Sequence, residues 1–168
     1  MEKLGLSFNR LINDIDIYCW DLDGTLGVYA FGKNGVDSCN DAYYQEYLKQ
    51  HNPYENVIPC VIIKRFIDRY TKKEDNYVIT VAQSEVEKRY KLGFILEHYG
   101  DKISPKNIIF VDHKSKKYDA LHEIESQRNR SKICLIDDTV GTLSSIQTSS
   151  LYATVHTSSF MSFEELFK

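Results

Sequence analysis

The sequence lacks the features that mark several common classes of protein. No apolar run approaches the roughly 20 residues that a membrane-spanning helix needs. The segment 1–16 (MEKLGLSFNRLINDID) has no long apolar core of the kind that a signal peptide carries. Internal repeats, low-complexity tracts and an obvious linker are also absent. We therefore expect neither a membrane protein nor a secreted precursor.

Cysteine is scarce. There are four cysteines, and they form no CxxC pair and no metal-like pairing with histidine. Two of them, Cys19 and Cys134, lie inside apolar runs, which is typical of buried free thiols. We interpret all four, including Cys39 and Cys60, as unpaired thiols, and we expect a reducing, cytoplasmic location.

The charge is nearly balanced. A net charge of −3 argues against a general nucleic-acid coat protein. Segment 114–132 nevertheless has a local excess of basic residues, namely Lys114, Lys116, Lys117, Arg128, Arg130 and Lys132. Such a patch could meet a polyanion, but we favour a solvated helix face. A nucleic-acid partner is therefore possible but not indicated by net charge, and the sequence leaves the oligomeric state open.

What is present is an ordinary globular composition, with 168 residues, 42% of them apolar and 27% charged. This length predicts one domain with a real core over residues 1–168. Residues 1–14 read as an additional N-terminal helix or arm. Five short apolar runs, rich in β-branched and aromatic residues, predict strands, and they lie at 15–20, 77–80, 107–111, 133–136 and 151–155.

Helix-like segments lie between these runs. Residues 57–72 have apolar residues at helical spacing, and a capping box at Ser84 opens a helix that runs to about Tyr99. Ser115 is expected to cap a third helix to about 127, and Ser162 begins another capping box. Apolar strands that alternate with helices predict an α/β fold, a three-layer doubly wound sheet of about five parallel strands.

The segment between the first two strands contains a candidate flap. Residues 27–38 (GVYAFGKNGVDS) predict a small β-hairpin with Asn34-Gly35 at its turn, because that pair tolerates positive φ. The hairpin would sit over the mouth of a site at the end of the first strand. Tyr29 and Phe31 on this hairpin are candidates for substrate contact.

Acidic residues follow the strands at the ends where α/β proteins bind ligands. The first strand runs into WDLDGTLG, which places Asp21 and Asp23 close together, and the fourth runs into Asp137-Asp138. Carboxylates that are this close repel one another unless a cation lies between them or one of them takes up a proton. Four carboxylates around an open-sided hard cation suit Mg²⁺, which keeps waters and meets substrate phosphate.

This pattern predicts phosphate chemistry. One acid of the first pair can be a nucleophile that forms an aspartyl-phosphate, and the other can donate a proton to the leaving oxygen and then activate water. The backbone of Leu22, Asp23 and Gly24, the hydroxyl of Thr80 with the adjoining Val81, and a lysine would hold the phosphoryl oxygens. His156, just past the fifth strand, is a weaker candidate.

These motifs resemble those of the haloacid dehalogenase-like (HAD) phosphohydrolases. The DxDGT motif matches residues 21–25, the strand that ends in threonine matches YVIT with Thr80, and the strand that ends in two acids matches ICLIDD. The resemblance covers roughly residues 15–160. It implies a HAD-like, Rossmannoid fold with a small flap and no large cap, an Asp21 nucleophile, and Asp23 as the acid and base of a phosphatase.

The resemblance also implies a lysine at the start of a helix. Lys114, Lys116 and Lys117 are all candidates, and Lys117 is preferred because it precedes an Ala-Leu pair, as the family lysine commonly does. In the acidic pair, Asp138 is expected to contact the metal and Asp137 to orient the lysine or a metal-bound water.

The layout is also similar to the phosphatase half of polynucleotide kinases, although Ala82 stands where that group often has arginine. We therefore expect a phosphorylated substrate, either a small molecule or the end of a macromolecule such as a nucleic acid, in an open site. A phosphotransferase that uses the same residues, or a phosphate-binding regulatory module, is the alternative.

Overall fold

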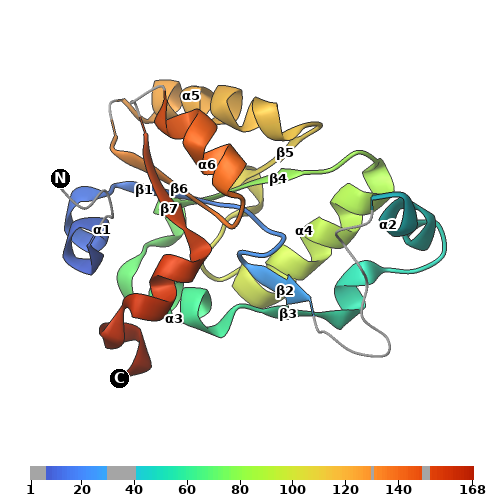
Figure 1. Ribbon diagram of the computed structural model, residues 1–168, viewed down its shortest axis with the longest axis horizontal. Helices are drawn as coiled ribbons and strands as arrows, with labels where there is room; N and C mark the ends of the chain where they lie inside the picture. The colour runs from blue at the N-terminus through green and yellow to red at the C-terminus, as the bar shows by residue number, and fades with distance from the viewer. Residues whose placement is uncertain (1–6, 30–40, 130, 149–151) are drawn as a thin grey trace.

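The computed structural model describes residues 7–29, 41–129, 131–148 and 152–168, and for residues 41–43 it describes the backbone only. Its centre is a sheet of five parallel strands, β1 (Ile17–Trp20), β4 (Asn76–Val81), β5 (Ile108–Val111), β6 (Ile133–Asp137) and β7 (Ala153–His156). The strand order is β5-β4-β1-β6-β7 (Figure 1). This arrangement confirms the predicted α/β class and doubly wound sheet.

The chain order explains where a site can form. From β1 the chain moves outward through β4 to β5, then returns to β6 on the other side of β1 and continues to β7. The strand order therefore reverses at β1, and in an open parallel sheet a ligand binds beside the carboxyl ends of the strands at this point. Cα pairing places Trp20 opposite Val78 on one side and Ile136 on the other, so the ends of the three strands lie at one edge.

Helices cover both faces of the sheet. Alternate residues of β1 divide between two cores, because successive side chains of a strand point to opposite faces. Tyr18 and Trp20 pack with α1 (Phe8–Asp14), α3 (Val61–Tyr70) and α4 (Glu85–Tyr99). Ile17 and Cys19 pack with α5 (Lys117–Arg128) and α6 (Val140–Gln147).

A small second sheet and a short helix complete the fold. Strand β2 (Gly27–Tyr29) pairs antiparallel with β3 (Val57–Pro59), and α2 spans Asp41–Leu48. The 3₁₀ turn η1 (Pro53–Asn56) joins this sheet to α4, where the rings of Tyr54 and Phe94 lie 5.7 Å apart. The expected hairpin turn at 34–35 and Phe31 lie outside the described residues.

Three helix predictions need correction. Residues 57–59 form β3, because Pro59 favours an extended residue before it and the segment pairs with β2, so the helix begins only at Val61. Ser115 does not open α5. Instead, 3₁₀ turn η4 (Lys114–Lys116) precedes it, with His113 as the cap. The predicted capping box at Ser162 gives no α-helix.

The chain instead ends in two 3₁₀ turns, η5 (Thr157–Ser162) and η6 (Glu164–Phe167). Phe160, Phe163 and Leu166 are all buried there. Phe160 lies in η5, Leu166 lies in η6, and Phe163 is the extended residue between the two turns. The remaining turns are η2 (Lys73–Asp75) and η3 (Pro105–Asn107).

The cysteines that the structure describes are unpaired, as the sequence predicted. Cys19 and Cys134 are buried free thiols and Cys60 is a half-buried free thiol, while Cys39 lies outside the described residues. Among the helices that the structure describes, none combines the length and the apolar character needed to cross a bilayer.

Candidate functional site

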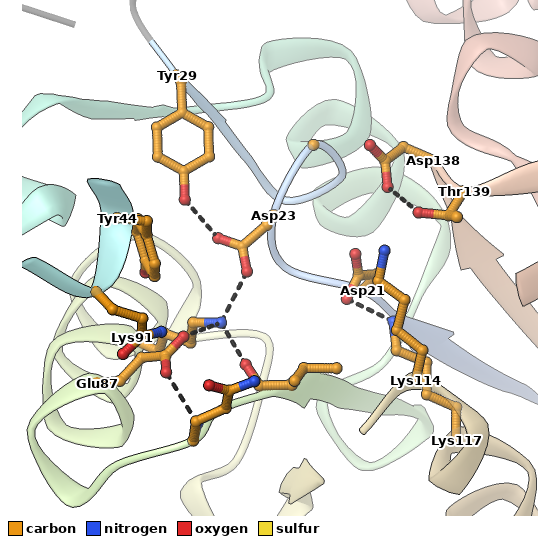
Figure 2. Close-up of a pocket in the computed structure, with 14 residues that line it drawn as sticks. Asp21, Asp23, Tyr29, Tyr44, Glu87, Lys91, Lys114, Lys117, Asp138 and Thr139 are labelled. Carbon is orange, nitrogen blue, oxygen red and sulfur yellow. Dashed lines mark hydrogen bonds and ion pairs between the residues drawn. The ribbon is translucent and has the colours of Figure 1, made fainter. Parts of the chain in front are cut away.

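A pocket of about 550 Å³ lies at the carboxyl edge of the central sheet. Its walls come from the loop after β1, the end of β4, the start of α5, the end of β6, and the neighbouring parts of α2 and α4 (Figure 2). A volume of this size is typical of a small-molecule site. The residues that line it are Asp21, Asp23, Gly24, Tyr29, Tyr44, Gln45, Val81, Gln83, Glu87, Lys91, Lys114, Lys117, Asp138 and Thr139.

The loop after β1 is a tight turn that presents the two aspartates. The Asp21 N–H donates to the Ile136 carbonyl at 2.9 Å, so β1–β6 pairing continues into the site. Gly24 has φ +77°, and a Cβ at this position would lie 2.2 Å from Oδ2 of Asp138. Glycine suits this position for its backbone conformation, and a larger residue would displace the Asp138 side chain.

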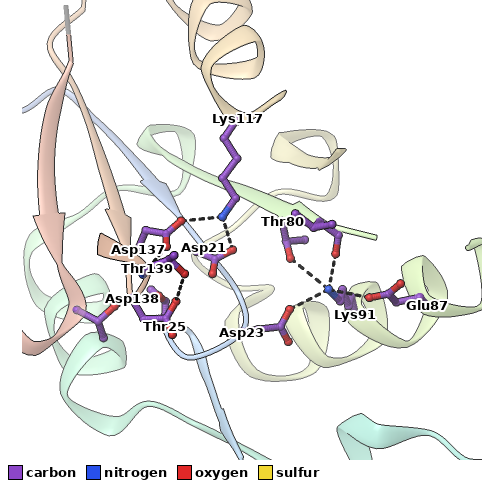
Figure 3. A network of polar contacts seen from close by, with 12 residues as sticks. Asp21, Asp23, Thr25, Thr80, Glu87, Lys91, Lys117, Asp137, Asp138 and Thr139 are labelled. Atoms are coloured by element: carbon purple, nitrogen blue, oxygen red, sulfur yellow. Dashed lines mark hydrogen bonds and ion pairs between the residues drawn. The ribbon is translucent and has the colours of Figure 1, made fainter. Parts of the chain in front are cut away.

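Lys117 lies between two buried carboxylates. Its Nζ donates to Oδ1 of Asp21 and to Oδ2 of Asp137, each at 2.7 Å (Figure 3). Burial opposes the charge of Lys117, but the two aspartates together raise its pKa. The structure brings the preferred lysine to the site, while Lys114 is exposed at the pocket rim and Lys116 pairs with Asp119 at 3.2 Å.

The two carboxylates that Lys117 contacts form a group with a third, Asp138. Ligand atoms of Asp21, Asp137 and Asp138 lie within 4.8 Å of one another. Burial raises the pKa of Asp21 to about 7, against the lowering effect of Lys117, and burial with the neighbouring Asp137 raises the pKa of Asp138. The group is short of positive charge, and its oxygen ligands suit Mg²⁺. The donor set therefore fits the expected metal.

Asp23 lies apart from these three carboxylates, although the sequence predicted it as a fourth ligand. Tyr29 and Tyr54 donate their hydroxyls to its Oδ1, and Lys91 donates to its Oδ2 at 2.8 Å. Burial alone would raise the pKa of Asp23, but the charge and hydrogen bond of Lys91, with the two hydroxyls, bring it below its usual value. The carboxylate is still one-third exposed, with 33% of its side chain open to the pocket.

Lys91 is the functional candidate that the sequence reasoning missed. It lies on α4, and its side chain is 3% exposed. Its Nζ also donates to the Val81 carbonyl and forms an ion pair with Glu87 at 3.0 Å. Helical periodicity in the sequence could have indicated it, because positions 87, 91 and 95 are spaced four apart and share the buried face of α4. A lysine and a glutamate on a buried face require a partner each.

Other predicted residues occupy less direct positions. Thr80 is fully buried, and its hydroxyl lies 3.5 Å from Nζ of Lys91, whereas the adjoining Val81 lines the pocket. Leu22 has a fully buried side chain, so only its backbone can serve the site. His156 bonds through Nε2 to the Asp138 carbonyl at 2.8 Å, which steadies the end of the acidic pair.

The basic residues of segment 114–132 have different surroundings. The Arg128 side chain bonds to Asp75 at 3.0 Å, away from the pocket, and Arg130 lies outside the described residues. Lys114, Lys116 and Lys132 are exposed. Lys117, the remaining basic residue of this segment, is buried in the site.

Comparison with known proteins shows the fold alone. No protein-family model and no curated protein matches the chain. A structure of DsGPDH of Dunaliella salina is similar, with a TM-score of 0.54, 19% identity and 88% of this chain covered. The chain spans only 24% of the length of DsGPDH. The HAD domain of the effector protein Lem4 from Legionella pneumophila matches with a TM-score of 0.46 and 16% identity, over 84% of each chain.

Proposed function

We propose that this chain is a Mg²⁺-dependent phosphomonoester hydrolase that works through an aspartyl-phosphate on Asp21. The observation that carries the proposal is the pair of aspartates at the end of the central strand, each held by its own buried lysine. Asp21 belongs to the group of three carboxylates, whereas Asp23 faces the rest of the pocket. One carboxylate is thus arranged for attack and the other for proton transfer.

The first step is attack by a carboxylate oxygen of Asp21 on phosphorus. A P–O bond forms to Asp21 as the P–O bond to the alcohol breaks, and the alcohol oxygen takes a proton from Asp23. Lys117, which contacts Asp21 and Asp137, supplies fixed positive charge beside the nucleophile. Asp21, Asp137 and Asp138 would hold Mg²⁺, which supplies further positive charge for the phosphoryl oxygens.

The second step is hydrolysis of the aspartyl-phosphate. Asp23, now ionised, takes a proton from a water molecule. The oxygen of this water attacks phosphorus, and the Asp21 carboxylate leaves. For the first step Asp23 must carry a proton, although Lys91 favours its ionised form in the free protein. A phosphate dianion in the pocket opposes Lys91, because like charge raises the pKa of a carboxyl group.

The test is a hydrolysis screen with and without Mg²⁺. The panel contains nucleotides, sugar phosphates, phosphopeptides, 3′-phosphorylated oligonucleotides and 4-nitrophenyl phosphate. We expect Mg²⁺-dependent release of phosphate from at least one class and a loss of several orders of magnitude in Asp21→Asn. The matched control is Asp119→Asn, because this exposed aspartate lies outside the pocket. Equal activity of Asp21→Asn and the parent would overturn the assignment.

Direct detection of the intermediate separates this route from direct attack by water. Acid quenching of the reaction should leave the mass of one phosphoryl group on the peptide that contains Asp21. In Asp23→Asn, with 4-nitrophenyl phosphate, we expect this species to accumulate because its hydrolysis lacks a base. Adding a small alcohol to the same assay shows whether phosphate passes to an acceptor other than water, as in a phosphotransferase.

A further inference from the structure

The wall behind Asp23 contains a second pair of buried charges. Lys91 and Glu87 both lie on α4, with side chains only 3% and 5% exposed. Nζ of Lys91 lies 3.0 Å from Oε1 of Glu87, and Oε2 of Glu87 accepts the Gln83 N–H at 2.9 Å. Figure 2 shows both side chains on the side of Asp23 away from Lys117.

Stability alone is a poor reason for this pair. Charges removed from water lose several kcal/mol of hydration each, and well-packed apolar residues in their place are often neutral or stabilising. Apolar side chains would also continue the buried face that Phe94 and Ile95 form on the same helix. The position of the pair instead lets Lys91 contact Asp23, which lies 68 residues earlier in the sequence.

The contacts of Lys91 join the segments that surround the leaving group in the proposed reaction. Its Nζ donates to Oδ2 of Asp23 and to the carbonyl of Val81, at the end of β4. The hydroxyls of Tyr29 and Tyr54 hold the other oxygen, Oδ1. The Asp23 carboxylate is therefore fixed from β2, from η1 and from α4, whereas Lys117 leaves it untouched and serves Asp21 (Figure 3).

We propose that Lys91 is a positioning residue for proton transfer, that it holds the Asp23 carboxylate toward the leaving oxygen, and that Glu87 provides its counter-charge. The inference rests on the proposed function and assigns the two buried lysines to different parts of the reaction. Lys117 serves the nucleophile, and Lys91 serves the acid and base. Loss of Lys91 should then matter most when the departing oxygen needs a proton.

The experiment compares two substrates that differ in this need. Glycerol phosphate releases an alkoxide that requires protonation, whereas 4-nitrophenyl phosphate releases a stable anion. The variant is Lys91→Met with Glu87→Gln, because this double change removes both charges together and glutamine still offers an acceptor to the Gln83 N–H. The control is Lys88→Met with Glu85→Gln, an exposed ion pair on the same helix with its atoms 2.6 Å apart.

Because hydrolysis of the aspartyl-phosphate is common to both substrates, the rate to compare is that of aspartyl-phosphate formation, measured by rapid acid quenching. We expect the Lys91/Glu87 variant to lose about 100-fold in this rate on glycerol phosphate, in the range of general-acid effects, and less than about 10-fold on 4-nitrophenyl phosphate. The control should match the parent on both substrates. Melting temperatures identify a folded variant, and a Lys91→Met single variant is used if the double variant does not fold. Any folded variant with this selective loss supports the proposal.

Equal losses on the two substrates, or none, would overturn the role of Lys91 while leaving the phosphatase intact. Failure of both Lys91 variants to fold would also overturn it, because the pair would then be required for the fold. If the parent hydrolyses neither substrate nor any member of the wider panel, the proposed function itself fails, and the role of Lys91 with it.

Discussion

Replacing Lys117 by Met tests the charge balance of the site directly. Methionine keeps an unbranched apolar side chain but leaves Asp21 and Asp137, which are 7% and 0% exposed, without their cation. We expect a large loss of stability in the absence of metal. We also expect Mg²⁺ to restore part of it, because the same two carboxylates belong to the group that fits the ion.

The magnitude follows from the geometry. At 2.7 Å, and with an effective dielectric constant of 20, each contact of Lys117 is worth about 6 kcal/mol of gross attraction. The hydration that the three charges lose on burial cancels much of this. Removing one partner from a buried pair typically costs about 3–5 kcal/mol. A domain of ordinary stability has about 5–15 kcal/mol in total, so the variant should remain folded with a much lower midpoint.

Urea unfolding at pH 8, monitored by tryptophan fluorescence, measures the loss of stability in Lys117→Met. With a denaturant slope of about 2 kcal/mol per molar, the midpoint should fall by about 2 M in EDTA. The matched control is Lys116→Met, an exposed lysine whose pairing with Asp119 should contribute less than about 1 kcal/mol. A Lys117 variant no less stable than this control would refute the reasoning. If saturating Mg²⁺ stabilises this variant no more than it stabilises the parent, the ion does not replace the lysine charge.

Three further predictions concern stability and metal binding. First, the pKa of Asp21 lies above its ordinary value, so its ionisation destabilises the metal-free fold as pH rises from about 4 to about 7. In EDTA, Asp21→Asn should be more stable than the parent at pH 8 and lose this advantage near pH 4, and the opposite order at pH 8 would contradict the raised pKa. Second, Mg²⁺ should raise the melting temperature of the parent and have a smaller effect on Asp138→Asn, since binding to the folded state stabilises it; equal shifts would remove Asp138 from the metal group. Third, Asn76→Ala should lower stability by about 3 kcal/mol in urea unfolding, because it leaves the buried Trp20 indole N–H, 3.0 Å from the Asn76 amide oxygen, unpaired. A change below about 1 kcal/mol would show that the indole finds another acceptor.

The sheet and its acidic edge could be predicted because both follow from local patterns. Each strand is a short apolar run, and runs without alternation indicate strands that are covered on both faces. The carboxyl ends of neighbouring parallel strands meet at one edge, so Asp21 and the Asp137-Asp138 pair were expected together. The structure places them so, with Trp20 opposite Ile136 in the sheet and Asp21 hydrogen-bonded to its carbonyl.

The partners of Asp23 could not be predicted, because they depend on contacts between distant segments. Lys91 lies within KRYKLGF and Tyr54 within NPYEN, and neither stretch is a recognisable motif. Sequence reasoning supposed that a metal ion must relieve the repulsion between Asp21 and Asp23. The structure instead gives each carboxylate its own lysine, at 2.7 and 2.8 Å, before any metal is considered.

Secondary structure was mispredicted where tertiary pairing outweighs local preference. Segment 57–59 reads as the first turn of a helix, yet it pairs with β2. At the C-terminus, the capping box at Ser162 favours an α-helix, but the chain instead forms two 3₁₀ turns separated by the extended residue Phe163, with Phe160, Phe163 and Leu166 buried. Both differences arise because packing energy exceeds the small energies of capping.

The contact between Gly24 and Asp138 has a consequence for how this protein can change over evolutionary time. The two residues are far apart in the sequence, yet a Cβ on Gly24 would lie 2.2 Å from Oδ2 of Asp138, so even one added methyl group would push the acidic side chain away. Insertions and drift in the 113 residues between them are tolerable only if the two strand ends return to the same spacing. The rest of the domain can diverge in sequence, whereas position 24 keeps a hydrogen atom where other residues have a Cβ.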